Sequence, residues 1–294
     1  MSRFRGWIQA GATLLTNLHL PNFLKGGLYQ GAGKTVCVPG LNCYSCPAAS
    51  GACPIGAFQA VVGSSKFSFS YYITGFLILL GVLLGRFICG FLCPFGWFQE
   101  LLHKIPTKKL STKKLMPLTY LKYAVLLVMV LLLPAFLVND VGMGDPFFCK
   151  YLCPQGVLEG AIPLSLANSG IRAALGKLFT WKFSILLSVI VLSVVFYRPF
   201  CKWLCPLGAF YALFNRVSLF QMKVDKSKCV SCGKCARACK MDVDVTKTPN
   251  HTECIRCGMC IRACPTNAVC FRYGFGDGKE KENAATLREN NNKA

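Results

Sequence analysis

Three apolar stretches without Lys, Arg, Asp or Glu divide the first two hundred residues of the chain, at residues 67–85, 123–139 and 183–197. The first has nineteen residues, within the range of about 17 to 25 that a helix needs to cross a bilayer. The third is shorter, but Lys182 and Arg198 flank it with long side chains that can reach the membrane interface. Each stretch therefore predicts a transmembrane helix; the alternative is a buried helix of a soluble protein.

A fourth stretch, residues 6–24, also lacks formal charge but contains Gln9, Thr13, Asn17 and His19. Such a segment is either a span that faces a protein interior or a helix lying in the membrane interface. We favour the span, which gives about four transmembrane helices. The segment lacks the short apolar core and small-residue cleavage site of a signal peptide, so we expect the N-terminus to be retained.

The basic residues between the stretches predict an orientation. Arg3 and Arg5 precede the first span, and lysines crowd the connection between the second and third: Lys104, Lys108, Lys109, Lys113 and Lys114. Cytoplasmic loops carry an excess of Lys and Arg. We therefore expect a multi-pass protein of the cell membrane with both termini in the cytoplasm, and residues 25–66 and 139–182 on the outer side.

Composition supports a membrane protein with redox chemistry. Hydrophobic residues make up 53% and charged residues 15%, against roughly 25% charged residues in ordinary soluble domains. The net charge of +21 would suit a nucleic-acid binder, but much of it lies in loops beside apolar segments, so we exclude nucleic acid as a partner. Nineteen cysteines in a chain too long for a disulfide scaffold favour metal or redox chemistry.

Eight of the cysteines form two copies of C-x2-C-x2-C-x3-C, in CVSCGKCARACK and CIRCGMCIRACP. In two-cluster ferredoxins the first three cysteines of a run hold one 4Fe–4S cluster and the fourth holds the other. The expected ligand sets are Cys229, Cys232, Cys235 with Cys264, and Cys254, Cys257, Cys260 with Cys239. Zinc ribbons use paired C-x2-C units, and disulfides are rare in the cytoplasm, so both alternatives are weaker.

A glycine stands at the same position in each run. Gly233 and Gly258 lack a Cβ, which lets the backbone turn closely around a cluster. The domain organisation expected is a transmembrane domain over residues 1–220, a small α+β bacterial-type ferredoxin domain over 221–275 and a disordered charged tail over 276–294.

A second motif, C-x3-C-P-x-G, recurs at the ends of the apolar stretches, in residues 86–98, 145–158 and 198–210, with a partial copy at 52–58. Residues four apart lie on one face of a helix, so each full copy predicts a two-thiolate clamp. Two clamps on the cytoplasmic side supply four ligands for a third cluster: Cys89, Cys93, Cys201 and Cys205. Arg86 and Arg198 precede these pairs and are expected to neutralise part of the cluster charge.

The cysteines assigned to the outer side are Cys37, Cys43, Cys46, Cys53, Cys149 and Cys153. We expect a fourth cluster drawn from Cys43, Cys46, Cys53 and one or both of Cys149 and Cys153. Disulfides, such as one between Cys149 and Cys153, or free buried thiols remain the alternative on an oxidising face. Cys270 is expected to be a small apolar residue packed behind the ferredoxin.

These motifs together resemble the membrane polyferredoxins of the NapH, NosR and YccM kind, over Cys89 to Cys264. The segment CYSCPAASGACPIGAFQ is similar to that of clostridial-type members of the group. The resemblance implies electron transfer between a quinol or other membrane partner and a redox protein. NosR-like chains also carry a flavin domain that this chain is too short to contain, so a flavin partner would be a separate polypeptide.

We therefore expect a membrane-bound relay of single electrons between a cytoplasmic partner, such as a soluble ferredoxin or flavoprotein, and a membrane quinone or an outer acceptor. It would be an electron-transfer subunit of the quinol dehydrogenase kind, with no catalytic residue of its own. The alternative function is assembly, maturation or redox sensing. Glu100 and Glu159 each follow a C-P-x-G turn, where a quinol proton acceptor or, more simply, an exposed carboxylate is expected.

Overall fold

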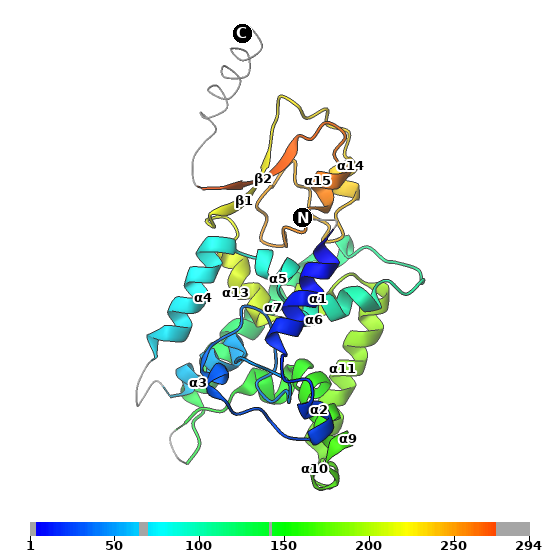
Figure 1. Ribbon diagram of the computed structural model, residues 1–294. Helices are drawn as coiled ribbons and strands as arrows, with labels where there is room; N and C mark the ends of the chain where they lie inside the picture. The colour runs from blue at the N-terminus through cyan, green and yellow to red at the C-terminus, as the bar shows by residue number, and fades with distance from the viewer. Residues whose placement is uncertain (1–3, 65–69, 141–142, 275–294) are drawn as a thin grey trace, which may run out of the picture.

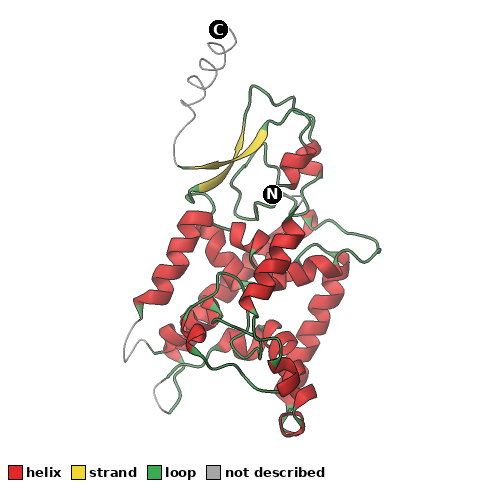
Figure 2. Ribbon diagram, in the orientation of Figure 1, coloured by secondary structure: helices red, strands yellow, loops and turns green. Residues whose placement is uncertain are grey.

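The computed structural model describes residues 4–64, 70–140 and 143–274. A body of short and long helices forms one end of the molecule, and a small unit with two strands forms the other (Figures 1 and 2). The expected tail at 276–294 lies outside the described residues.

The first half of the chain is helical, with irregular loops between the helices. Its elements are α1 Arg5–Thr16, α2 Asn22–Lys25, the 3-10 turn η1 Ala32–Thr35, α3 Pro54–Gly63, α4 Tyr71–Leu84, α5 Phe87–Phe91 and α6 Pro94–Leu102.

The middle of the chain forms longer helical segments in which 3-10, α and π geometry alternate. A continuous run joins η2 Lys113–Tyr120, α7 Leu121–Val125, η3 Leu126–Leu132 and α8 Leu133–Phe136. Then follow η4 Phe148–Leu152, η5 Gly156–Ala161, α9 Ile162–Ala167, α10 Ser169–Ala173, α11 Lys177–Val195, α12 Pro199–Trp203 and α13 Pro206–Phe214.

Two helical segments within the described residues are long and apolar enough to cross a membrane, Lys113–Phe136 and Lys177–Val195. They contain most of the second and third predicted spans. The described part of the predicted span at 67–85 forms the 14-residue helix α4, and residues 67–69 are not described. Two of the about four expected spanning helices thus have the required length in the described part of the chain, and the total of four stays a prediction.

The expected span at residues 6–24 is instead the 12-residue helix α1 followed by a turn. Its polar side chains explain the early end. Asn17 Nδ2 donates to Thr13 O at 3.1 Å, and Asn17 itself leaves helical geometry at φ −132° and ψ 57°. Side chains that bond to nearby backbone compete with continuation of a helix. The polar face does face protein, because buried Gln9 donates to Gly90 O at 3.0 Å.

The motif C-P-x-G begins helices. Cys53, Cys93 and Cys205 are the N-caps of α3, α6 and α13, and proline occupies the first turn of each. Proline suits this position because it needs no N–H partner there. The expected clamp of two cysteines on one continuous helix is wrong for this reason. Cys93 is extended (φ −90°, ψ 115°) because a residue before proline avoids the helical region, so the helix carrying Cys89 ends first.

The C-terminal unit contains β1 Phe220–Val224, α14 Lys234–Arg237, α15 Met259–Ala263 and β2 Val269–Tyr273. The two strands pair antiparallel, with Met222 opposite Phe271. Gly233 and Gly258 are left-handed, with φ of 68° and 75°, directly before the two helices. Cys270 is exposed rather than packed, because it alternates along β2 with buried Val269.

The two ends of the molecule share one core. Met241, Val243 and Ile255 of the C-terminal unit pack in the same buried cluster as the residues around Cys89 and Cys93. Polar contacts support this packing: Arg256 donates to Leu84 O at 2.8 Å. The C-terminal unit therefore lies directly on the ends of α4 and α5.

Candidate iron–sulfur sites

The structure brings the first expected ferredoxin quartet together. Cys229, Cys232, Cys235 and Cys264 line one cavity of about 20 Å³. Thr266 and neighbouring backbone N–H groups hydrogen-bond the Cys264 sulfur and lower the pKa of its thiol. This quartet lies at the solvent-exposed end of the C-terminal unit, where Cys232 is exposed. We call it the distal site.

The second expected quartet surrounds a separate cavity of about 20 Å³, lined by Cys239, Cys254, Cys257 and Cys260. Burial raises the pKa of the Cys254 thiol to about 11 and that of Cys260 to about 12. Thiols with such pKa values carry a proton near neutral pH, so a metal centre must displace these protons when it binds. We call this the proximal site because it faces the helical body.

A buried charge cluster joins the proximal site to the helical body. Glu253, next to Cys254, forms ion pairs with Arg86 (2.9 Å) and with Lys122. Burial alone would raise the pKa of the Glu253 carboxyl, but the two cations outweigh it and hold that pKa below its ordinary value. Both cations are fully buried, so the charges are paired as buried charges must be.

A third quartet, the inner site, consists of the cysteines expected there: Cys89, Cys93, Cys201 and Cys205. All four are buried, and each lies within electrostatic range of the other three. They come from α5, α12 and the N-caps of α6 and α13. The two cysteines of each motif copy lie on successive helices. The turn before the proline nevertheless keeps their sulfur atoms close together.

The two arginines of the inner site reach across it reciprocally. Arg86 Nη2 donates to Cys201 O at 3.3 Å, and Arg198 Nη1 donates to Cys89 O. Each side chain is fully buried. Each of the two motif copies thus places a guanidinium beside the backbone of the other copy's first cysteine. The expected neutralisation of cluster charge stays a prediction.

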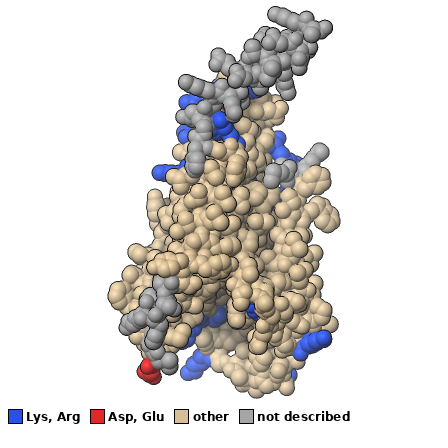
Figure 3. Space-filling view, turned by 60° about the vertical axis from the view of Figure 1, so that its left-hand side comes forward, with Lys and Arg blue, Asp and Glu red and all other residues tan. Residues whose placement is uncertain are grey.

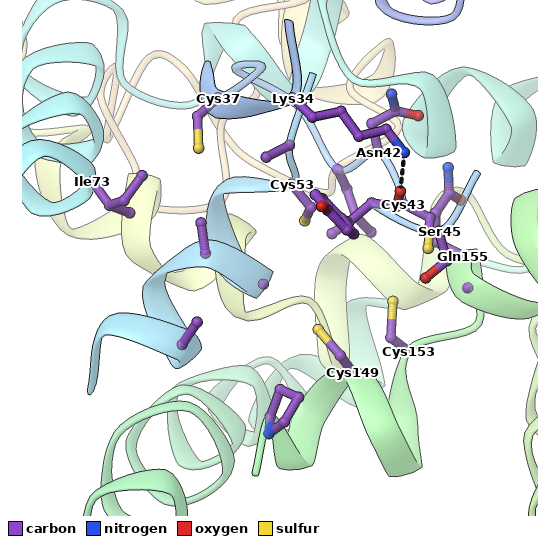
Figure 4. A pocket seen from close by; sticks show the side chains of 18 of the residues that line it. Lys34, Cys37, Asn42, Cys43, Ser45, Cys53, Ile73, Cys149, Cys153 and Gln155 are labelled. Carbon is purple, nitrogen blue, oxygen red and sulfur yellow. Dashed lines mark hydrogen bonds between the residues drawn. The ribbon is translucent and has the colours of Figure 1, made fainter. Parts of the chain in front are cut away.

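Five of the six cysteines assigned to the outer side line a much larger cavity of about 530 Å³. In Figure 4 the sulfur atoms of Cys149 and Cys153 point from one segment toward Cys43 and Cys53. These four cysteines all lie within electrostatic range of one another. We call this quartet the outer site.

Two further cysteines sit at the margin of the outer site. Cys37 lines the cavity but lies apart from the quartet in Figure 4. Cys46, expected from the sequence as a ligand, does not line this cavity. It is fully buried among Ala48 and Ala49, and its sulfur faces Asn17 Oδ1 at 3.5 Å. The geometry therefore favours Cys149 and Cys153 together over Cys46.

The four sites follow one another through the molecule. Buried Tyr211 lies within electrostatic range of Cys53 of the outer site and of Cys89 and Cys93 of the inner site. At the other side of the inner site, Gly90 lies against the backbone of Ile255, between Cys254 and Cys257 of the proximal site. The succession is outer, inner, proximal and distal.

The two carboxylates expected to be exposed are not. Glu100 is 13% exposed and contacts Arg5, Tyr197 and Arg198, with 2.7 Å to Arg198 Nε. Glu159 is partly buried and accepts a hydrogen bond from the Cys43 N–H at 3.1 Å. Both carboxylates therefore face the protein interior and contact segments that carry site cysteines: Glu159 contacts Cys43, and Glu100 contacts Arg198, which precedes Cys201.

All the expected ligands except Cys46 lie in quartets, and all nineteen cysteines, which lie in the described part of the chain, are free thiols. No three His, Cys, Asp or Glu side chains of the described residues converge as they would around a single metal ion. A cubane cluster is larger than an ion and sits among sulfurs that do not meet at one point. The four thiols of each quartet are the donor set of such a cluster, which would bind as 4Fe–4S and exchange one electron.

Sequence reasoning missed Gln59 and Gln99, each of which contacts a site cysteine. The signal was present one residue beyond the motif copies, in CPIGAFQ and CPFGWFQ. Tyr211 was also missed, and no motif marks it.

Comparison with known proteins agrees with the cysteine pattern. A family model described as a 4Fe-4S binding domain matches residues 51–71, 68–113, 122–162 and 178–227, together more than half of the chain. A second, described as a 4Fe-4S dicluster domain, matches residues 221–265. No solved structure matches the chain.

Three relatives illustrate the range of similarity. An uncharacterized protein of Methanocaldococcus jannaschii is 31% identical over 209 residues, which are 68% of this chain and 77% of the relative. The putative electron transport protein YccM of Escherichia coli is 26% identical over 180 residues, 58% of this chain and 45% of YccM. The regulatory protein NosR of Pseudomonas aeruginosa is 27% identical over 168 residues, 54% of this chain and 21% of NosR.

The matched segments thus span less than half of YccM and about a fifth of NosR. The two family models cover the C-x3-C-P motifs and the dicluster motif, which carry the resemblance seen in the sequence. The chain therefore belongs to the 4Fe-4S binding family of membrane polyferredoxin-type proteins that includes YccM and NosR.

Proposed function

We propose that this protein is a membrane-bound relay that passes single electrons through four 4Fe–4S clusters, held at the distal, proximal, inner and outer sites. The observation that carries the proposal is the succession of four cysteine quartets from one end of the molecule to the other. Such a succession has a use only if electrons enter at one end and leave at the other.

The chain's own residues keep neighbouring sites close together. Tyr211 donates its hydroxyl to Pro39 O at 3.1 Å and thereby holds the loop that carries Cys37 and leads to Cys43 against the inner site. Asn215 Nδ2 donates to Cys254 O at 2.9 Å and holds the proximal site on the end of α13. The buried pairs around Glu253 fix the same junction.

The surface supports placement of the helical body in a bilayer. Figure 3 shows Lys and Arg at the two ends of this face, with a wide band between them that carries none. Large apolar side chains are exposed on the long helices, including Leu127, Phe136, Leu187 and Val191. Exposed apolar surface of this extent is typical of a membrane or protein interface. The ferredoxin unit would then lie in the cytoplasm and the outer site near the opposite face.

The electrons would come from, or go to, an acidic soluble carrier at the distal end. Residues 220–274 contain ten Lys and Arg against four Asp and Glu. The acidic side chains make contacts within the protein. Glu253 and Asp242 form ion pairs with cations of the helical body, and Asp244 accepts a hydrogen bond from Thr246 in its own loop. Lysines remain exposed around the distal site, at Lys228 and Lys234. A ferredoxin or flavoprotein of negative charge fits this face.

The outer end would exchange electrons with a membrane quinone or an outer acceptor. The outer cavity is far larger than the two ferredoxin cavities, at about 530 Å³ against about 20 Å³. It therefore has room beside a cluster for part of a partner molecule.

The test is iron and acid-labile sulfide per chain in anaerobically purified protein. About sixteen Fe per chain is expected, because each cluster holds four. Replacement of Cys43, Cys53, Cys149 and Cys153 by Ser should lower this to about twelve. A matched variant with Cys46→Ser and Cys270→Ser removes two thiols that the geometry leaves outside the quartets and should keep about sixteen.

About eight Fe in the unsubstituted protein would overturn the four-cluster relay. A fall with the Cys46 variant equal to that of the quartet variant would move the outer ligand set back to Cys46. Stoichiometric reduction of a metal without turnover with a soluble carrier would favour the maturation alternative.

A further inference from the structure

Two buried glutamines occupy the same place in the two membrane-associated sites. Gln59 and Gln99 each stand six residues after the cysteine of a C-P-x-G motif, Cys53 and Cys93. Both are fully buried. They lie on α3 and α6, one turn and a half into the helices that these motifs begin.

Each glutamine donates a hydrogen bond to a cysteine sulfur of the opposite motif copy. Gln99 Nε2 lies 3.1 Å from Cys201 Sγ, and Gln59 Nε2 lies 3.2 Å from Cys149 Sγ. The two cysteines are themselves equivalent, because each is the first cysteine of a C-x3-C-P-x-G copy. The same bond is therefore built twice, at two sites far apart in the sequence.

The remaining atoms of each amide fix which end faces the sulfur. Gln99 Oε1 accepts the Phe200 N–H at 3.2 Å, and Gln59 Oε1 accepts the Phe148 N–H at 2.9 Å. Each Nε2 also donates to the carbonyl four residues earlier, at 3.3 Å. A flipped amide would lose the backbone N–H and turn an oxygen toward the sulfur. The donor is thus held toward the sulfur by three partners.

The chemistry of sulfur gives this bond a purpose. A neutral thiol is a weak acceptor, whereas a thiolate is a charged one and forms the stronger bond. An N–H that points at a ligand sulfur withdraws electron density from it and favours the reduced cluster, which carries one more negative charge. The geometry therefore suits a metal-bound thiolate at Cys149 and at Cys201.

We propose that Gln59 and Gln99 are positioning residues that raise the reduction potentials of the outer and inner clusters through one N–H···S bond each. This inference rests on the relay proposed above. Because the bond is repeated, it shifts both reduction potentials in the same direction. The difference in potential between the inner and outer clusters therefore stays small.

The test replaces each glutamine with methionine, which has similar length but no N–H donor. Potentials are measured by redox titration followed by electron paramagnetic resonance, together with iron per chain. Gln99→Met should lower the potential of the inner cluster alone, and Gln59→Met that of the outer cluster alone. The expected size is about tenfold in the reduction equilibrium, or about 59 mV for a one-electron couple. Gln221→Met on β1, away from these sites, is the control and should move neither.

Unmoved potentials with full iron would overturn the inference and leave the relay intact. A protein that lacks the third and fourth clusters before any substitution would instead overturn the relay. If a methionine variant fails to retain its cluster, the hydrogen bond is tested in the unsubstituted protein instead. With glutamine side chains labelled with ¹⁵N, a pulsed resonance measurement should detect nitrogen coupled to both reduced clusters. Absence of that coupling would refute the N–H···S bonds.

Discussion

Asp242 holds the ferredoxin unit to the helical body through a small, partly buried network. Its carboxylate pairs with Lys202 at 3.1 Å and accepts hydrogen bonds from Ser111 at 2.9 Å and from Thr112. Burial alone would raise the pKa of the carboxyl, but these hydrogen bonds and the lysine outweigh it and hold the pKa below its ordinary value. The ionised form is therefore the one that stabilises the junction.

Asp242→Asn should loosen this junction by about 1.5–3 kcal/mol, the usual worth of hydrogen bonds to a charged group. Since the pKa in the folded protein is depressed, the stabilisation is present above about pH 4, the ordinary range of aspartate, and disappears as pH falls through the folded value. Hydrogen exchange at residues 111–112 and 239–244 measures it. Asp244→Asn, whose side chain binds only its own loop, is the control. Equal exchange in both variants would contradict the assignment.

At the same scale, sequence reasoning grouped the cysteines of the distal, proximal and inner quartets as the structure places them, because the spacing within each motif is a local property. Their role as cluster ligands stays a prediction. It placed Cys89 and Cys93 on one helix and was wrong, since Pro94 ends that geometry before it begins the next helix. The absence of Cys46 from the outer quartet depends on how the loop over residues 37–53 folds, which no spacing rule fixes.

At the scale of elements, α5 packs at Gly90 against the loop of the proximal site that contains Ile255. A Cβ on Gly90 would lie 2.3 Å from Ile255 O, closer than any real contact. Arg5 Nε and Gln9 Nε2 also donate to Gly90 O, each at 3.0 Å. The absence of a side chain at Gly90 is what brings Cys89 near the proximal site.

Gly90→Ala should force α5 and the loop apart and lower stability by about 1–3 kcal/mol, as overpacking does. Gly75→Ala is the matched control: it lies in α4 with open space where its Cβ would be, so it should raise stability by about 0.5–1 kcal/mol. Denaturant unfolding in detergent compares the two. Full iron with slower reoxidation of the proximal cluster is expected for Gly90→Ala, whereas a stability equal to that of Gly75→Ala would show that the contact is not tight.

The long apolar segments at 123–139 and 183–197 were predictable because nothing interrupts them, and both lie largely within long helices. The segment at 6–24 was not, because its polar residues bond to the helix backbone and to the body rather than to a longer helix. At this scale the sequence predicts the apolar elements and not where polar contacts end them.

At the scale of the whole molecule, charge and apolar surface are sorted by position. The sequence predicted a basic loop between the second and third spans, and Ser111 and Thr112 of that loop contact the ferredoxin unit. The side of the membrane on which the loop lies stays a prediction. What the sequence could not predict is that Glu253 and Asp242 of that unit face the helical body, because this depends on which cations of the body meet them. The exposed face that results is basic, at Lys226, Lys228, Lys234 and Lys247.

A basic docking face makes the reaction with an acidic carrier depend on salt. With reduced flavodoxin as the acidic probe, the second-order rate should fall as ionic strength rises, because the Debye length shortens to about 10 Å at 0.1 M. Replacing Lys228 and Lys234 by Glu should lower the rate about tenfold at low salt, the lower end of electrostatic steering effects. Arg172→Glu with Lys177→Glu changes the net charge equally at α10 and the first residue of α11, at the end of the molecule away from the ferredoxin unit (Figure 1), and should leave the rate nearly unchanged. Equal effects of the two double variants would mean that net charge alone steers the carrier, and a rate that rises with salt would show that the carrier meets a different face.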